Sequence, residues 1–138
     1  MKVGAGGLIE KEGKLLLIQR TRDPFINTRN LPAGYVEVDE SPIRAVNREV
    51  YEETSLKVEI DKLVDVYFFT DDPRGNGFLI TYKYKLIGGE SIENPEEKSP
   101  TYFTASDIPH NIAGGGHDQV VIAWKKTIDN KSFKLLHS

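Results

Sequence analysis

The chain has 138 residues, 38% of them hydrophobic and 28% charged, and a formal net charge of −3. This is enough chain for one globular domain with a hydrophobic core, and we expect a single domain over residues 1–138. The 21 acidic and 18 basic residues leave no broad basic surface, which argues against a nucleic-acid duplex as a partner.

Cysteine and long apolar stretches are both missing from the chain. Without cysteine there are no disulfides or thiolate metal sites, which fits a reducing compartment. The first residues lack the apolar stretch of a signal peptide, and no run approaches the roughly 18 apolar residues of a membrane span. We therefore expect a cytoplasmic protein with no membrane partner.

A β-hairpin is predicted at the start of the chain. Two short apolar runs, Val3–Ile9 and Lys14–Gln19, flank a turn at Gly13. The glycines of the first run indicate that another part of the molecule approaches its backbone closely. The polar segment 21–34 contains two prolines and predicts a loop.

The first predicted helix begins after Ser41, whose side chain can accept a backbone N–H, and Pro42 suits its first turn. We expect this helix to run from Pro42 to Thr54.

The second half of the chain predicts three strands and one more helix. Residues 58–70 and 78–86 are rich in β-branched and aromatic residues, and the turn sequence DDPRGNG joins them. A short strand is expected at 101–104, and three glycines precede a helix over about His117–Ile128. The pattern predicts an α/β fold, a three-layer α/β/α sandwich with a central mixed β-sheet.

An acidic face is predicted on the first helix. At about 100° per residue, with Glu49 as the origin, Glu53 lies near +40° and Glu52 near −60°. The predicted buried stripe lies between about +60° and +120° and consists of Val46, Val50 and Ile43. Carboxylates beside a core repel one another and lose hydration, which costs stability unless a cation or a proton intervenes.

Two interpretations of these glutamates remain open at this point. Hard oxygen ligands suit Mg²⁺ or Mn²⁺, and Mg²⁺ in particular binds through a few carboxylates plus substrate phosphates. The same residues also fit a solvated helix face held by i,i+4 ion pairs, such as Arg48 with Glu52.

The wider stretch separates the two interpretations. A glycine is followed after five residues by a glutamate, and after seven more by Arg-Glu, an aliphatic residue, any residue, Glu-Glu, two residues and another aliphatic residue. The positions concerned are Gly34, Glu40, Arg48, Glu49, Val50, Glu52, Glu53 and Leu56. This pattern resembles the signature of the Nudix hydrolase family. Ser55 is the one departure, because the family has glycine there to end the helix in a left-handed conformation that costs serine about 1 kcal/mol.

The resemblance implies a metal-dependent enzyme. Nudix hydrolases cleave a nucleoside diphosphate linked to another group X, across the pyrophosphate, with a divalent cation. By this resemblance the ligands of Mg²⁺ or Mn²⁺ would be Glu49, Glu52, Glu53 and the backbone carbonyl of Ala33.

The resemblance also assigns roles around the metal ligands. Arg48 and Glu40 would pair and hold the glutamates in position, as contacts behind a ligand commonly do. Gly34 would be structural. The general base is a signature glutamate in some members, here Glu49 or Glu52, and an acidic loop residue in others. The loop candidates are Glu93, Glu96 and Glu97, and Glu96 matches a frequent acidic position, although a solvated loop fits all three.

Substrate contacts are predicted from residue type alone. Arg20 and Arg29 could supply positive charge to a diphosphate, and Phe25 could stack on a base. Ordinary surface charge and core packing are the alternatives for these residues.

Three functions are compatible with the signature. The sequence LPAGYVE resembles the loop of members acting on dinucleotide-like or sugar-linked diphosphates, and our first hypothesis for the substrate is ADP-ribose or a nucleotide sugar. The second is a pyrophosphohydrolase of nucleoside triphosphates that cleanses the dNTP pool. The third is a non-catalytic nucleotide-binding regulator, which we would expect to lack signature glutamates. Relatives acting on dinucleotides often dimerise, and the first strand could take part in a homodimer.

Overall fold

A computed structural model describes residues 1–88 and 99–137, with side chains up to Lys131. Its elements are β1 (Lys2–Lys11), β2 (Lys14–Gln19), β3 (Arg29–Asn30), β4 (Ala33–Tyr35), α1 (Pro42–Thr54), β5 (Lys57–Phe69), β6 (Gly77–Gly88), β7 (Thr101–Phe103) and α2 (His117–His137). No helix of this described part is long and apolar enough to cross a membrane.

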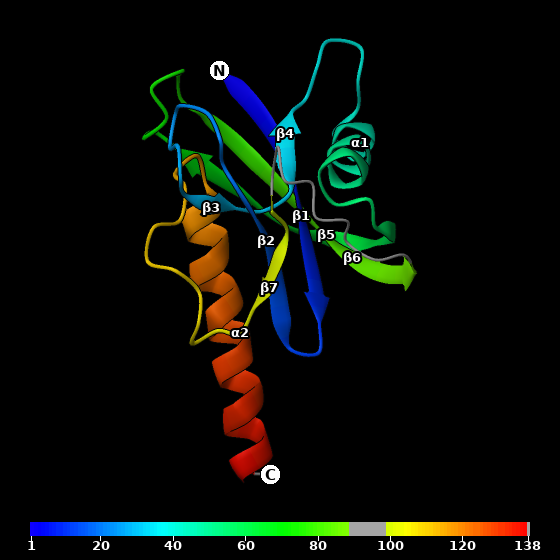
Figure 1. The fold of residues 1–138 in the computed structure, drawn as a ribbon, viewed down its shortest axis with the longest axis vertical. Coiled ribbons are helices and arrows are strands. Elements are labelled where there is room, and N and C mark those ends of the chain that lie inside the picture. Colours follow the sequence, from blue (N-terminus) through cyan, green and yellow to red (C-terminus); the bar gives the residue numbers. More distant parts are fainter. Residues whose placement is uncertain (89–98, 138) are drawn as a thin grey trace.

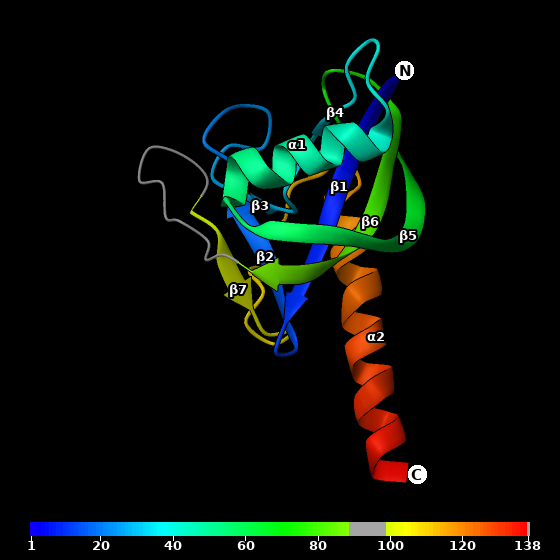
Figure 2. The same ribbon diagram turned by 90° about the vertical axis from the view of Figure 1, so that its right-hand side faces the viewer.

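The strands form one mixed sheet in the order β3-β2-β1-β6-β5. β1 runs parallel to β6 and antiparallel to β2. Two short strands lie outside this order, β4 paired with β1 and β7 paired with β2. The two helices cover opposite faces of the sheet (Figures 1 and 2). The predicted α/β fold with a central mixed sheet is therefore confirmed.

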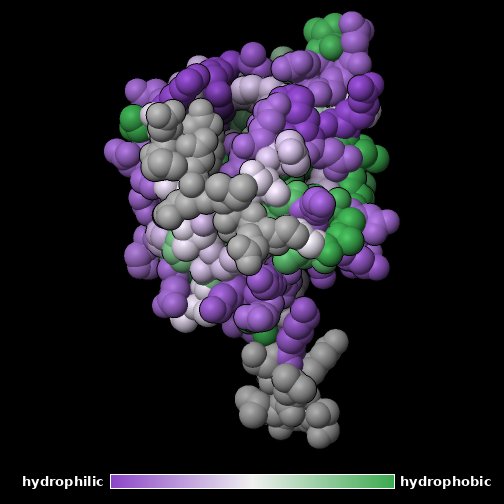
Figure 3. All heavy atoms as spheres, turned by 45° about the vertical axis from the view of Figure 1, so that its right-hand side comes forward, coloured by the Kyte–Doolittle hydropathy of each residue, from purple (hydrophilic) through white to green (hydrophobic). Residues whose placement is uncertain are grey.

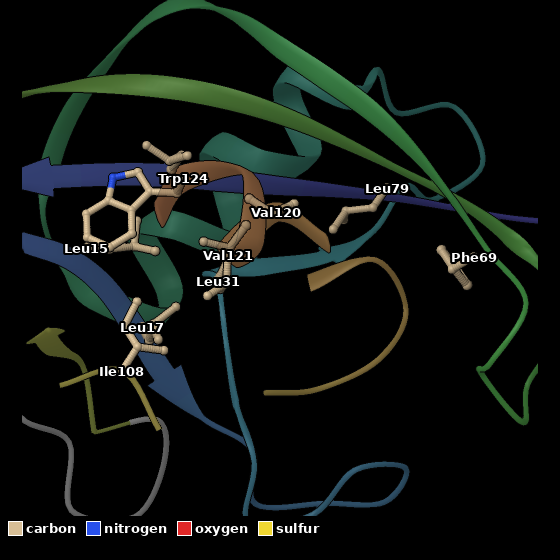
Figure 4. Packing of buried hydrophobic residues seen from close by; sticks show 10 residues of the cluster. Leu15, Leu17, Leu31, Phe69, Leu79, Ile108, Val120, Val121 and Trp124 are labelled. Atoms are coloured by element: carbon tan, nitrogen blue, oxygen red, sulfur yellow. The ribbon is translucent and has the colours of Figure 1, made fainter. Parts of the chain in front are cut away.

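Two apolar clusters hold the layers together. Successive residues of β2 alternate between them, because side chains of a strand point to opposite faces in turn. Leu16 packs in the cluster beneath α1, while Leu15 and Leu17 pack with Trp124 beneath α2 (Figure 4). Elsewhere the surface is largely hydrophilic on the face seen in Figure 3, as the charged fraction of the sequence leads one to expect.

Gly7 of β1 allows α1 to approach the sheet closely. A Cβ on Gly7 would lie 2.9 Å from Val50 Cγ2, so the expected close approach is made by α1. In the strand order given above, β1 lies in the middle of the sheet.

α1 has the predicted bounds, and its ends follow from local chemistry. Ser41 Oγ accepts a hydrogen bond from the Arg44 backbone N–H at 3.2 Å, and Pro42 occupies the first turn. The expectation that Ile43 is buried was wrong, since it is 47% exposed. The buried sector instead drifts around the helix from Ala45 to Thr54, as a straight helix crossing a twisted sheet requires.

α2 continues to His137, beyond the end predicted at Ile128. The predicted end was wrong because the apolar stripe marks only the part of the helix that packs on the sheet. Figure 1 shows the last turns projecting away from the sheet.

Ser55 ends α1 in the left-handed conformation, with φ 59° and ψ 12°, and its N–H donates to the Tyr51 carbonyl at 2.9 Å. Ser55→Gly should stabilise the protein by about 1 kcal/mol, because glycine adopts this conformation without the clash that a Cβ brings. Urea unfolding measures the difference. Ser55→Ala is the control, since alanine keeps the Cβ, and equal stabilisation by both variants would contradict this account.

Candidate functional site

The acidic face of α1 lies against β4. Glu53 Oε1 accepts a hydrogen bond from the Ala33 backbone N–H at 2.8 Å. Gly34 lies directly beneath Glu49, because a Cβ added there would be 2.7 Å from Glu49 Cγ and closer still to its carboxylate. Four residues apart on one helix, the two glutamates share a face, and they lie against neighbouring residues of β4, Glu53 against Ala33 and Glu49 against Gly34.

Arg48 contacts several of the surrounding carboxylates. It donates to Glu40 from Nε at 2.9 Å and from Nη2 at 3.1 Å, and from Nη1 to Glu49 at 2.8 Å. Glu52 Oε2 lies 3.6 Å from the same Nη1. The hydrogen bond from Arg48 lowers the pKa of Glu40, and the bond to Glu40 in turn raises the pKa of Arg48. A single guanidinium thus offsets part of the negative charge of this face.

The donor set of this face fits a hydrated divalent cation. No three acidic or histidine side chains converge on one point within the described residues, so the protein forms no closed cage there. Mg²⁺ does not need such a cage, because it usually retains several waters and binds through one or two carboxylates plus substrate phosphates. The Glu52 side chain is 55% exposed at the edge of this face.

A cavity of about 110 Å³ adjoins the acidic face and shares Ala33 and Gly34 with it. Polar and aromatic side chains supply most of its chemistry. They are Arg20, Phe25, Asn30, Tyr35, Phe69, Asp72, Arg74 and His117.

Arg74 is held in place over the cavity. Its Nε and Nη2 donate to the Asp72 carboxylate at 3.0 and 2.8 Å, and its guanidinium lies 4.6 Å from the centre of the Tyr35 ring. Tyr35 Oη donates to Asp72 at 3.1 Å. The hydrogen bond from Arg74 lowers the pKa of Asp72 to about 2, whereas burial raises the pKa of Tyr35 to about 12.

Arg20 adds a second cation to the cavity. Its Nε donates to the Pro24 carbonyl at 2.7 Å. Burial, and then the nearby charge of Arg74, lower the pKa of Arg20. The charged residues that line the cavity are two arginines and one carboxylate, Asp72, so the lining carries a net positive charge, which suits an anion.

Asn30 offers an acceptor to the same space. It is 3% exposed, and its Oδ1 has no hydrogen-bond partner within the described residues. A buried polar atom left without a partner costs free energy, so a donor on a bound ligand would be favoured here.

His117, at the start of α2, is buried and neutral. Its Nδ1 accepts a hydrogen bond from the Leu31 backbone N–H at 3.2 Å, which places the ring proton on Nε2. Burial, and then the charges of Arg20 and Arg74, lower the pKa of His117 to about 3.

The buried histidine should make the protein less stable in mild acid. Below a pH of about 6.5 the unfolded chain binds a proton at His117 that the folded chain refuses, so stability falls as pH falls. Between pH 7 and pH 5 this histidine should cost about 2 kcal/mol of unfolding free energy. Urea unfolding at both pH values measures the loss. His117→Asn retains an acceptor for Leu31 and should remove most of it, whereas His110→Asn, at an exposed histidine, should not. An equal loss of unfolding free energy between pH 7 and pH 5 in the parent protein and in both variants would contradict this assignment.

The fold places most of the predicted site residues in two adjoining regions, the acidic face and the cavity. The signature residues Ala33, Gly34, Glu40, Arg48 and the three glutamates are brought together at β4 and α1, and Arg20 and Phe25 line the adjoining cavity. Glu93, Glu96 and Glu97 lie outside the described residues.

Arg29 does not line the cavity. Its Nη1 donates to the Ser99 carbonyl at 2.7 Å, and its guanidinium lies 5.3 Å from the centre of the Phe103 ring. These contacts tie β3 to β7 and to Ser99 before it, and the substrate contact expected of Arg29 stays a prediction.

Sequence reasoning missed Asp72, Arg74 and His117. DDPRGNG was interpreted only as a turn, although an acid and a base two residues apart in a turn are a usable signal. No sequence feature indicated that this turn would meet β4 and the start of α2.

The sequence model of the NUDIX domain matches residues 1–124, and the chain belongs to the Nudix hydrolase family. It is 39% identical over 108 residues to an ADP-ribose pyrophosphatase of Methanocaldococcus jannaschii. That match covers 78% of this chain but only 64% of the archaeal protein.

Solved structures agree with this family. A MutT NUDIX hydrolase from Burkholderia pseudomallei has a TM-score of 0.77 and 28% identity, and the match covers 87% of this chain and 95% of that one. An ADP-ribose pyrophosphatase from Streptococcus suis has a TM-score of 0.69 and 27% identity, with 94% and 91% of the two chains covered. The resemblance drawn from the signature is confirmed at the level of the family, whose members typically use divalent metals.

Proposed function

We propose that this protein is a metal-dependent Nudix pyrophosphohydrolase acting on a nucleoside diphosphate linked to X, of the ADP-ribose or nucleotide-sugar type. Cleavage would give a nucleoside monophosphate and a phosphorylated X. The observation that carries the proposal is the junction at Ala33 and Gly34, where a carboxylate face and a cavity with two arginines meet. A pyrophosphate lying across that junction would have its negative charge balanced on both sides, by a metal ion at the carboxylate face and by the arginines of the cavity.

The carboxylate side is the proposed metal site. Glu49, Glu52 and Glu53, together with the Ala33 carbonyl, would hold Mg²⁺ or Mn²⁺. When bound, such an ion neutralises pyrophosphate charge and lowers the pKa of a nearby water. Arg48, anchored by Glu40, would keep Glu49 and Glu52 on the correct side of the helix.

The general base is proposed among the same glutamates. Glu52 is half exposed and lies 3.6 Å from Arg48, whereas Glu49 accepts a hydrogen bond from Arg48 at 2.8 Å. An oxygen of Glu52 is therefore the freer of the two to take a proton from the attacking water. Glu96 remains a candidate from the sequence alone.

The cavity side would bind the rest of the substrate. Arg20 and Arg74 would contact the diphosphate, with Arg74 kept rigid by Asp72. Phe25 and Tyr35 would flank the base or the sugar, and Asn30 Oδ1 would accept a hydrogen bond from it. The names of the archaeal relative and the streptococcal structure support ADP-ribose as the first substrate to test.

The test is a comparison of kcat/KM for ADP-ribose, a nucleotide sugar and the dNTPs at one Mg²⁺ concentration. We expect ADP-ribose or the nucleotide sugar to be preferred by about a hundredfold, which corresponds to roughly 2.7 kcal/mol at the transition state. Turnover should stop with a chelator and return with Mg²⁺ or Mn²⁺. A hundredfold preference for a dNTP would instead make this a pool-cleansing enzyme. Tight binding of ADP-ribose without turnover of any substrate would favour a regulator.

A further inference from the structure

A second hollow lies between α2 and the sheet and has no lining residue in common with the cavity described above. Its volume is about 260 Å³. The buried side chains of Leu8, Val120 and Trp124 form part of its apolar lining, and Lys62, Lys83 and Lys131 also line it. We call it the lysine groove.

Two of these lysines lie close enough to repel each other when no anion occupies the groove. Lys62 of β5 stands directly opposite Lys83 of β6 in the antiparallel register, and irregularities in β5 flank this pair on both sides. Like charges in directly opposed positions of a sheet are destabilising. Neither lysine has a carboxylate within 4 Å among the described residues, whereas Lys85 on the same strand has Asp61 at 3.8 Å.

The carboxylate that lines the groove forms no close ion pair with these lysines. Glu10 belongs to the groove, but its Oε2 accepts the indole N–H of Trp124 at 3.4 Å and forms no ion pair within the described part of the chain. Among the described residues the groove therefore combines an apolar floor with three lysines and one carboxylate, which is an excess of positive charge. That combination suits a small molecule with an apolar body and an anionic head.

We propose that the lysine groove binds a small amphiphilic carboxylate, a medium-chain fatty acid or a molecule of the same chemistry. The chain would lie against Leu8, Val120 and Trp124, and the carboxylate between Lys62 and Lys83. A nucleotide fits less well, because its polar sugar would face the apolar floor and lose hydration there. A volume just below the range of drug-sized pockets also favours a compact ligand. The proposal is independent of the substrate of the hydrolase site.

Trp124 provides the measurement, since it is the single tryptophan of the chain and lines the groove. Decanoate, titrated below its micelle concentration into the intact protein, should change tryptophan emission saturably. Decanol, which has the same chain without the charge, should bind about tenfold more weakly or worse, and added salt should weaken decanoate binding alone.

Lysine variants identify the head-group site. The double variant Lys62→Gln, Lys83→Gln should bind decanoate about tenfold more weakly, whereas Lys85→Gln, on the same strand but outside the groove, should bind it as the parent does. Val64→Glu places a carboxylate in the groove at a residue that is 39% exposed, and it should abolish binding while leaving the protein folded by circular dichroism.

Three results would each overturn the proposal. They are the absence of saturable binding, equal affinity for decanoate and decanol, and an equal loss of affinity in Lys85→Gln and the double variant.

Discussion

Glu53→Gln should lower kcat/KM for ADP-ribose by about a hundredfold or more, with the protein still folded. The substitution removes one negative charge from the proposed metal site but keeps an oxygen that can accept the hydrogen bond from Ala33 N–H. The local geometry of α1 and β4 should therefore survive while metal affinity falls. Steady-state kinetics over a range of Mg²⁺ concentrations measures both effects, and part of the lost activity should return at high Mg²⁺.

The matched control is Glu59→Gln, which makes the same charge change at an exposed position of β5. It should leave kcat/KM near the parent value. In metal-free buffer Glu53→Gln should also melt no lower than the parent, because repulsion among the glutamates is reduced. If Glu53→Gln and Glu59→Gln both keep parental turnover, Glu53 is a surface residue and the metal site is elsewhere.

Gly34→Ala is expected to have the second large effect. A Cβ at this position would overlap the Glu49 side chain, lying 2.7 Å from its Cγ. Glu49 is a flexible side chain and can swing away, so the cost in stability should be small. Its carboxylate would then leave the position that Arg48 Nη1 holds at 2.8 Å. We expect kcat/KM to fall by about tenfold to a hundredfold.

Gly88→Ala is the control for this substitution, since a Cβ there would meet nothing within 4 Å. The urea midpoints of both variants should stay near that of the parent. Unchanged kinetics in Gly34→Ala would mean that the position of Glu49 is not important for turnover. A large loss of stability would mean that the backbone of β4, and not Glu49, yields to the new methyl group.

The acidic half of the site was predictable because its residues are close together in the sequence. Positions 34 to 56 include β4, a short loop and one helix, so helical periodicity alone places Glu49 and Glu53 on one face. The capping chemistry of Ser41 and Pro42 similarly gave the start of α1. The left-handed end at Ser55 followed from the family pattern, even though serine replaces glycine there.

The basic half of the site could not be predicted in this way. Tyr35 contacts Asp72 across 37 positions of the chain, and Leu31 contacts His117 across 86. Such contacts depend on how the β5–β6 turn and the start of α2 settle over β4, which no local pattern encodes. The contacts of Arg29 could not be predicted for the same reason, because its partner Ser99 is 70 positions away.

The ionisation of the cavity has a consequence for its charge. Burial lowers the pKa of His117 to about 3 and raises the pKa of Tyr35 to about 12, and the hydrogen bond from Arg74 lowers the pKa of Asp72 to about 2. The two arginines remain cationic throughout that interval. The charge carried by these five lining groups is thus the same in mild acid, at neutral pH and in mild alkali. Any bell-shaped pH–rate profile of this enzyme must then report the glutamates of α1, another group outside the cavity, or the substrate itself.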